Sequence, residues 1–95
     1  MKLSLVIPIY NASEFINDSM QSISHWMKSI DYTLEVILVN DGSSDNTKQV
    51  VEDYIKYTDS KVKLISYDDN KGKGYAVKQG MLAAAGDFRI FTDAD

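Results

Sequence analysis

The chain has 95 residues, 44% of them hydrophobic, and no cysteine, so it fits one compact domain and excludes a disulfide framework or a thiolate zinc site. Its formal net charge of −4 at pH 7 argues against nucleic-acid binding, because proteins that follow phosphate backbones carry basic stripes. The first apolar stretch, residues 3–9, is too short for a membrane span and contains Pro8. With no cysteine to indicate an oxidising compartment, we expect a cytoplasmic setting.

Apolar runs and amphipathic segments alternate along the chain. Residues 3–9 and 35–39 are near-continuous apolar runs rich in β-branched residues, which is typical of buried parallel strands. Between them, apolar residues recur at alternating steps of four and three, which indicates an amphipathic helix with Asn11 or Ser13 as its N-cap. These apolar residues are Ile16, Met20, Ile23, Met27 and Ile30.

The alternation continues to residue 92. Ser44 or Asp45 can cap a second helix, whose apolar face runs through residues 47–58, and residues 62–67 predict a third strand. An alanine-rich segment, residues 74–85, predicts a third helix.

The last helix leads into a fourth strand. We expect Gly86 to end the helix in a left-handed C′ position, and residues 88–92 to form the strand. Strands and helices that alternate with short crossovers predict an α/β fold, with helices on both faces of a parallel sheet. Ligands of such sheets bind beyond the carboxyl ends of the strands.

Polar residues follow the predicted strands at that edge of the sheet. The first strand leads into Tyr10, the second into Asp41, and the last into Asp93 and Asp95. Because alternate side chains of a strand share a face, Asp93 and Asp95 would present two carboxylates together, which suits Mg²⁺ or Mn²⁺. With Tyr10 available to stack on a base, these residues predict a pocket for a nucleotide diphosphate.

Each motif also has a purely structural interpretation. A short acidic segment can simply end a strand, and residues 40–45 can be a tight loop into a capped helix. Asp41 has no evident capping role, which leaves a hydrogen bond to a base or ribose as an alternative to structure alone. Residues 70–74, Asn-Lys-Gly-Lys-Gly, are equally a glycine turn into a helix or a loop that holds a diphosphate.

Taken together and in this order, the motifs resemble the nucleotide-binding half of family 2 glycosyltransferases with the GT-A fold. The segments that carry the resemblance are residues 5–11, 36–47, 70–80 and 91–95. The resemblance implies a three-layer α/β/α, Rossmann-like parallel sheet with strand order 3-2-1-4. Residues 70–87 look most like dolichyl- or polyprenyl-phosphate glucosyltransferases, which transfer a sugar from a nucleotide donor to a lipid phosphate.

The resemblance also implies roles for single residues. Those implied to bind the nucleotide sugar are Pro8, Tyr10, Asn11, Asp41, Lys71 and Asp93. Asp41 would hydrogen-bond the base, Lys71 would lie near the diphosphate, and Asp93 and Asp95 would hold Mg²⁺ or Mn²⁺. Many relatives that act on lipid phosphates carry a glutamate where this chain has Ala12, so a carboxylate contact at that position is not expected.

The implied reaction is an inverting transfer from a nucleotide-diphosphate sugar to a polyprenyl or dolichyl phosphate. UDP-glucose is the favoured donor and GDP-mannose the alternative, while a polysaccharide or other glycan is an alternative acceptor. The metal would stabilise the charge on the departing nucleoside diphosphate. A general base, where one is used, is expected beyond Asp95.

Members of this family continue past the metal-binding motif with strands that build the acceptor site. We therefore expect residues 1–95 to be a single nucleotide-sugar-binding domain, part of a longer glycosyltransferase domain that works at the cytoplasmic face of a membrane. Residues 88–92 would then be an open sheet edge, and an open apolar edge favours homo-oligomers.

Two other classes of protein fit less of the chain. A strand followed by Asp-x-Asp also opens haloacid-dehalogenase-type phosphotransferases, but there the motif follows the first strand. A non-enzymatic nucleotide-binding module is the other alternative. A dehydrogenase is disfavoured because Val77 stands where the third glycine of the dinucleotide fingerprint belongs.

Overall fold

The computed structural model describes residues 2–29, 33–58 and 62–93. Within these ranges the elements are β1 (Lys2–Ile9), α1 (Ile16–Met27), β2 (Thr33–Asp41), α2 (Thr47–Tyr57), β3 (Val62–Tyr67), α3 (Lys73–Ala83) and β4 (Phe88–Phe91). The strands form one parallel sheet in the order β3-β2-β1-β4. The predicted α/β class and strand order are confirmed. No helix in the described ranges is long and apolar enough to cross a membrane.

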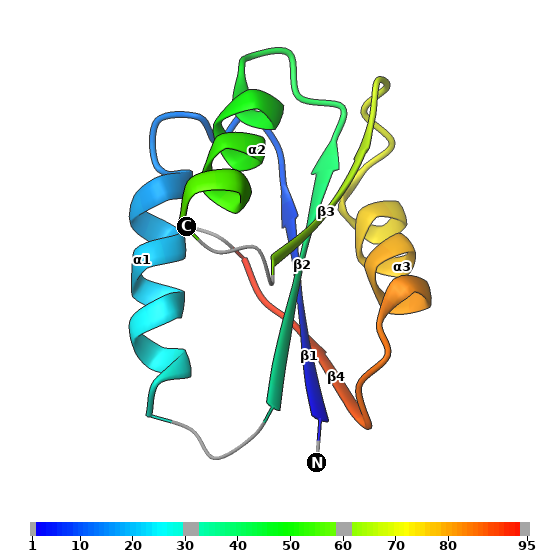
Figure 1. Ribbon diagram of the computed structural model, residues 1–95. Helices are drawn as coiled ribbons and strands as arrows, with labels where there is room; N and C mark the ends of the chain where they lie inside the picture. Colours follow the sequence, from blue (N-terminus) through cyan, green and yellow to red (C-terminus); the bar gives the residue numbers. More distant parts are fainter. Residues whose placement is uncertain (1, 30–32, 59–61, 94–95) are drawn as a thin grey trace.

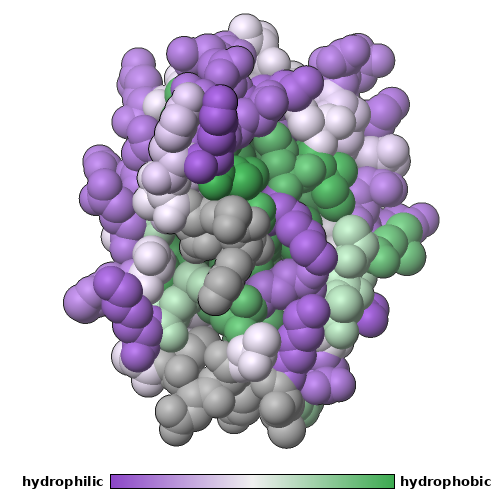
Figure 2. Space-filling model, viewed as in Figure 1, coloured by the Kyte–Doolittle hydropathy of each residue, from purple (hydrophilic) through white to green (hydrophobic). Residues whose placement is uncertain are grey.

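The helices cover both faces of the sheet, with α1 and α2 on one face and α3 on the other (Figure 1). Leu5 and Ile7 of β1 pack in the core beneath α1 and α2, whereas Val6 between them packs in the core beneath α3. The central strands are therefore buried on both faces, as their continuous apolar sequences predict. In the same view, Figure 2 shows patches of apolar surface near the middle of the molecule, interrupted by polar side chains, in the region where the edge strand β3 runs in Figure 1.

The α3 helix approaches the sheet closely because small residues face it. A Cβ atom added to Gly80 would lie 2.2 Å from Cγ1 of Val6, so any side chain there would push the helix off the strand. Ala76, one turn earlier, is fully buried. This contact depends on the absence of side-chain bulk and not on a broad apolar stripe.

The predicted N-cap of α1 is wrong. Phe15 precedes the helix as its N-cap residue and makes no side-chain hydrogen bond there. The Asn11 side chain instead accepts hydrogen bonds from Ser44, and the Ser13 hydroxyl donates to Asp45. Both polar residues are therefore used to join two loops and not to begin a helix.

The predicted end of α3 is also wrong, because the helix stops at Ala83 and Ala84 is extended. Gly86 is not among the described residues with positive φ. It is required for space, since a Cβ there would lie 2.6 Å from Oγ of Ser4. The glycine therefore allows the chain to pass closely over β1 before β4 begins.

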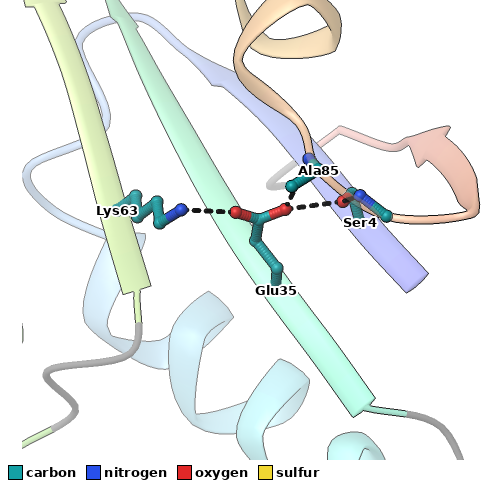
Figure 3. Close-up of polar contacts among 5 residues, drawn as sticks. Ser4, Glu35, Lys63 and Ala85 are labelled. Atoms are coloured by element: carbon teal, nitrogen blue, oxygen red, sulfur yellow. Dashed lines mark hydrogen bonds and ion pairs between the residues drawn. The ribbon is translucent and has the colours of Figure 1, made fainter. Parts of the chain in front are cut away.

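A buried carboxylate joins the strands at their amino ends (Figure 3). Glu35 on β2 is 5% exposed and accepts hydrogen bonds from Oγ of Ser4 at 2.7 Å and the N–H of Ala85 at 3.0 Å. It also pairs with Nζ of Lys63 on β3 at 2.6 Å. Oγ of Ser4 in turn accepts the N–H of Gly86 at 2.9 Å. One carboxylate thus connects three strands and the segment that leads into β4.

The environment of Glu35 favours its ionised form. Burial alone would raise the pKa of this carboxyl, but the hydrogen bonds from Lys63, Ser4 and Ala85 outweigh burial and lower the pKa from 4.5 to about 2. A lowered pKa means that ionisation stabilises the folded chain relative to the unfolded chain. This contribution is present above about pH 4.5 and is lost as the pH falls towards 2.

We predict that Glu35→Gln lowers the free energy of unfolding at pH 7 by about 2–4 kcal/mol, because an amide offers one acceptor oxygen to three donors and removes the charge that faces Lys63. Urea unfolding at several pH values measures this loss. The difference between the wild type and the variant should shrink as the pH falls from about 5 towards 2. A difference that is independent of pH would contradict a role for the ionised carboxylate, and Glu52→Gln on the exposed face of α2 is the matched control.

Candidate functional site

A pocket of about 240 Å³ lies at the carboxyl ends of β1, β2 and β4. Its lining residues are Pro8, Ile9, Tyr10, Asp41, Asn70, Gly72, Lys73 and Asp93. Four of the residues predicted from the sequence therefore lie around one space: Pro8, Tyr10, Asp41 and Asp93. A larger hollow of about 430 Å³, between α1 and α2, contains none of them.

Asp41 ends β2 as a carboxylate that is only 4% exposed. Its Oδ1 accepts hydrogen bonds from the Tyr67 hydroxyl at 2.7 Å and the N–H of Lys71 at 2.9 Å. Its Oδ2 accepts from Nδ2 of Asn70 and the N–H of Gly72, each at 3.0 Å. Asp41 therefore holds residues 70–72 in place directly before α3 begins.

This structural role of Asp41 was not evident from the sequence. Four internal donors already occupy the carboxylate, so a hydrogen bond to a base would require one of them to exchange. Burial and the hydrogen bond to Asp41 raise the pKa of Tyr67, so its hydroxyl keeps its proton and remains a donor. The predicted contact of Asp41 with a base stays a prediction.

Gly42 fits the same loop closely. Its φ is +64°, and a Cβ atom added there would lie 2.2 Å from the backbone nitrogen of Asn70. Both the left-handed conformation and the close approach require glycine at this position. The position of Asn70, which lines the pocket, is thus fixed by backbone packing as well as by the carboxylate of Asp41.

The lysine that lines the pocket is Lys73. As the first residue of α3, it pairs with Asp93, which also lines the pocket, with 2.6 Å between Nζ and Oδ1. Lys71 is not among the lining residues; it donates its backbone N–H to Asp41, and its ammonium lies 5.7 Å from the centre of the Tyr75 ring. The diphosphate role of Lys71 stays a prediction, and Lys73 is a candidate that the sequence argument did not single out.

Asn11 lies beside the pocket, in a left-handed conformation with φ 49°. Its Oδ1 accepts the N–H of Ser44 at 2.8 Å, and its own N–H donates to Oγ of Ser43 at 2.9 Å. Asn11 therefore ties the end of β1 to the loop after β2 and fixes the backbone next to Tyr10, which is 50% exposed. Its predicted place in a nucleoside pocket stays a prediction.

Asp45 joins the same two loops from the other side. Its carboxylate accepts the Ser13 hydroxyl at 2.8 Å and the N–H of Thr47, the first residue of α2, at 2.9 Å. Burial would raise the pKa of Asp45, but the hydrogen bonds from Thr47 and Ser13 lower it to about 2. Asn46 is the N-cap residue of α2. Asp45 therefore accepts the first free N–H of the helix from one position earlier than a standard capping side chain.

Asp93 is the one member of the predicted metal pair that the structure describes, because Asp95 lies outside the described residues. Within the described ranges, no three acidic, histidine or cysteine side chains gather as a metal centre. Mg²⁺ and Mn²⁺ need only one or two carboxylates when waters and substrate phosphates complete the shell. Asp93 already binds a cation, the ammonium of Lys73, at the edge of the pocket. An exposed carboxylate that pairs with a cation is the type of group that contributes to such a metal site.

The parallel sheet with a charged pocket at its strand ends defines an α/β protein whose candidate ligand site lies at the carboxyl edge of the sheet. Residues 4–95 match the sequence profile of glycosyl transferase family 2, and the chain belongs to that family. It is 33% identical over 99 residues to the dolichyl-phosphate beta-glucosyltransferase of Dictyostelium discoideum, which covers 98% of this chain and 30% of that relative. The predicted family is confirmed.

Solved structures agree with this assignment. The mannosyltransferase PcManGT from Pyrobaculum calidifontis, in complex with GDP-Man and Mn²⁺, superposes with a TM-score of 0.82 at 27% identity, over 98% of this chain and 27% of that one. S. aureus TarS 1-349 in complex with UDP-GlcNAc superposes with a TM-score of 0.71 at 31% identity, over 100% of this chain and 27% of that one. The fold is of the GT-A type, and the chain spans less than a third of the length of these relatives.

We predict that Asp41→Asn lowers the free energy of unfolding by about 2–4 kcal/mol, because the amide group places its own N–H donors against donors that now bind a carboxylate. Tyr67→Phe removes one donor only and should cost about 1 kcal/mol. Urea unfolding measures both losses. Hydrogen exchange should show faster exchange of the Lys71 and Gly72 amides in Asp41→Asn, and unchanged exchange there would contradict the proposed anchoring.

Proposed function

We propose that this chain carries the donor site of an inverting glycosyltransferase, which transfers a sugar from a nucleotide-diphosphate sugar to a polyprenyl or dolichyl phosphate. One observation carries the proposal: an aromatic ring, two carboxylates and an ammonium surround a single pocket at the carboxyl ends of the strands. These groups belong to Tyr10, Asp41, Asp93 and Lys73. The similarity to a dolichyl-phosphate glucosyltransferase supports a lipid phosphate as the acceptor.

The groups around the pocket have complementary chemistry. Tyr10 is half exposed and offers an aromatic face on which a base can stack. The amino-terminal end of α3 and the ammonium of Lys73 place positive charge at the pocket, where a diphosphate would be held. Asp41 keeps residues 70–72 in position, so this charged part of the pocket is formed before the donor binds.

A divalent cation completes the proposed site. Bound Mg²⁺ or Mn²⁺ would act as a Lewis acid that stabilises negative charge on the departing nucleoside diphosphate. We assign Asp93 and Asp95 as its protein ligands, and the Mn²⁺ in the PcManGT complex supports a divalent metal in this type of fold. A lipid-phosphate acceptor is already anionic and needs little activation by a base.

The proposed donor is UDP-glucose, with GDP-mannose as the alternative. The name of the Dictyostelium relative, a glucosyltransferase, favours glucose. The two solved relatives hold GDP-Man and UDP-GlcNAc, so similar folds accept either type of nucleotide. Titration with both nucleotides is therefore needed to choose between them.

We predict that the chain binds UDP and UDP-glucose more tightly in the presence of Mn²⁺ than in its absence, and more tightly than GDP-mannose, as measured by calorimetric titration. Tyr10→Ala should weaken nucleotide binding about tenfold, because stacking of a base on an aromatic ring contributes about 1–3 kcal/mol. Tyr57→Ala, at an exposed tyrosine on α2, is the control. A folded chain that binds none of these nucleotides, or binds them equally well after Tyr10→Ala, would contradict the proposed donor site.

We also propose that the chain associates with itself through β4. This strand pairs with β1 on one side, and its Phe88, Ile90 and Phe91 side chains are 56%, 45% and 52% exposed. Light scattering at increasing concentration should show a mass above that of the monomer, and Ile90→Lys should reduce it, because a charge on an edge strand opposes pairing. Tyr57→Lys should leave the mass unchanged. A monomeric mass at high concentration would contradict the proposal.

A further inference from the structure

We propose that Lys73 is the exchangeable counter-ion of the donor site. Its ammonium neutralises Asp93 when no ligand is bound, and it turns to the donor diphosphate when a divalent cation takes its place at Asp93. This inference rests on the proposed function and adds to it a coupling between the cation and the diphosphate.

The pair that carries the inference lies in the pocket and is accessible to ligands. Nζ of Lys73 is 2.6 Å from Oδ1 of Asp93, and the two side chains are 56% and 57% exposed. An ion pair that is this exposed contributes about 1 kcal/mol or less to stability. It is therefore strong enough to hold the ammonium at the carboxylate and weak enough to exchange.

The other carboxylate of the pocket is buried and is held by several internal hydrogen bonds. Asp41 is 4% exposed, and its two oxygens accept four internal hydrogen bonds. A cation that approached Asp41 would have to break the contacts that hold residues 70–72. Of the two described carboxylates that line the pocket, Asp93 is thus the one that a cation can reach without disturbing the fold.

Lys73 is placed so that its ammonium can move while its backbone stays fixed. It begins α3, and the preceding residue, Gly72, is held by its hydrogen bond to Asp41. The flexible four-carbon stem of a lysine allows its ammonium to change partner without a change in the backbone. A diphosphate in the pocket would offer the ammonium anionic oxygens next to the amino-terminal end of the helix.

Charge balance then couples the two ligands. A divalent cation that binds alone must displace the ammonium from Asp93 and leave it without an anionic partner. A diphosphate that binds alone draws the ammonium away and leaves the Asp93 carboxylate near the phosphates. When both ligands bind, each charge has a partner, so each ligand should increase the affinity for the other by the same factor.

The test compares the wild type with Lys73→Met, which keeps the length of the side chain but removes its charge. Binding of Mn²⁺ alone is followed by the electron paramagnetic resonance signal of free Mn²⁺, and binding of UDP is followed by calorimetry with and without Mn²⁺. We expect Lys73→Met to bind Mn²⁺ alone about three- to tenfold more tightly, because a nearby positive charge is lost. It should bind UDP more weakly, and Mn²⁺ should enhance UDP binding less than in the wild type.

Two further variants control for charge and for folding. Lys78→Met removes an exposed lysine of α3 that does not line the pocket, and it should change neither affinity. Lys73→Arg keeps the positive charge and should bind Mn²⁺ alone as weakly as the wild type. If Lys73→Met binds Mn²⁺ alone no more tightly than the wild type, the exchange is overturned, because the ammonium then does not compete with the metal for Asp93.

The failure of this inference can be told apart from the failure of the proposed function. If the wild type binds UDP with Mn²⁺ and Tyr10→Ala weakens that binding, but Lys73→Met changes neither affinity, the donor site stands and the exchange is overturned. If Lys73→Met binds Mn²⁺ more tightly but no variant binds a nucleotide, the competition at Asp93 is supported and the donor site is overturned.

Discussion

The shape of the pocket depends on one buried carboxylate at the end of β2. A carboxylate that is taken out of water needs hydrogen-bond donors, because an unsatisfied buried charge is very costly. Asp41 obtains four donors from segments that follow it in the chain: Tyr67, Asn70, Lys71 and Gly72. These contacts decide where α3 begins, and thereby which lysine lines the pocket. The arrangement of the site thus follows from the hydrogen bonds that the buried carboxylate of Asp41 requires.

The opposite end of β2 follows the same principle. Glu35 accepts the N–H of Ala85, just after α3, while Asp41 accepts the N–H groups of Lys71 and Gly72, just before it. Both ends of α3 are therefore tied to one strand by carboxylates. This arrangement explains how a helix with small residues such as Ala76 and Gly80 on its buried side stays firmly on the sheet.

The sequence predicted the features that depend on local pattern. The strands follow from continuous apolar runs, and the gathering of Tyr10, Asp41 and Asp93 follows from the rule that parallel strands end at one edge. The features that it missed depend on distant partners. The donors to Asp41 lie 26 to 31 residues away, and Asn11 serves a loop 33 residues away instead of capping the nearby helix. Those same distant contacts also determine that Lys73, and not Lys71, lines the pocket.

Because carboxylates on β2 hold both ends of α3, the distance between Glu35 and Asp41 limits the length of that helix. From Glu35 to Asp41 the strand covers about 20 Å at about 3.3 Å per residue. The 11 residues of α3 cover about 16 Å at 1.5 Å per residue. The helix and the short segments that flank it therefore match the distance between the two carboxylates. Lengthening or shortening α3 by one turn, about 5.4 Å, would pull one end away from its carboxylate. Variation in the length of this fold is therefore better tolerated outside residues 71–85 than within them.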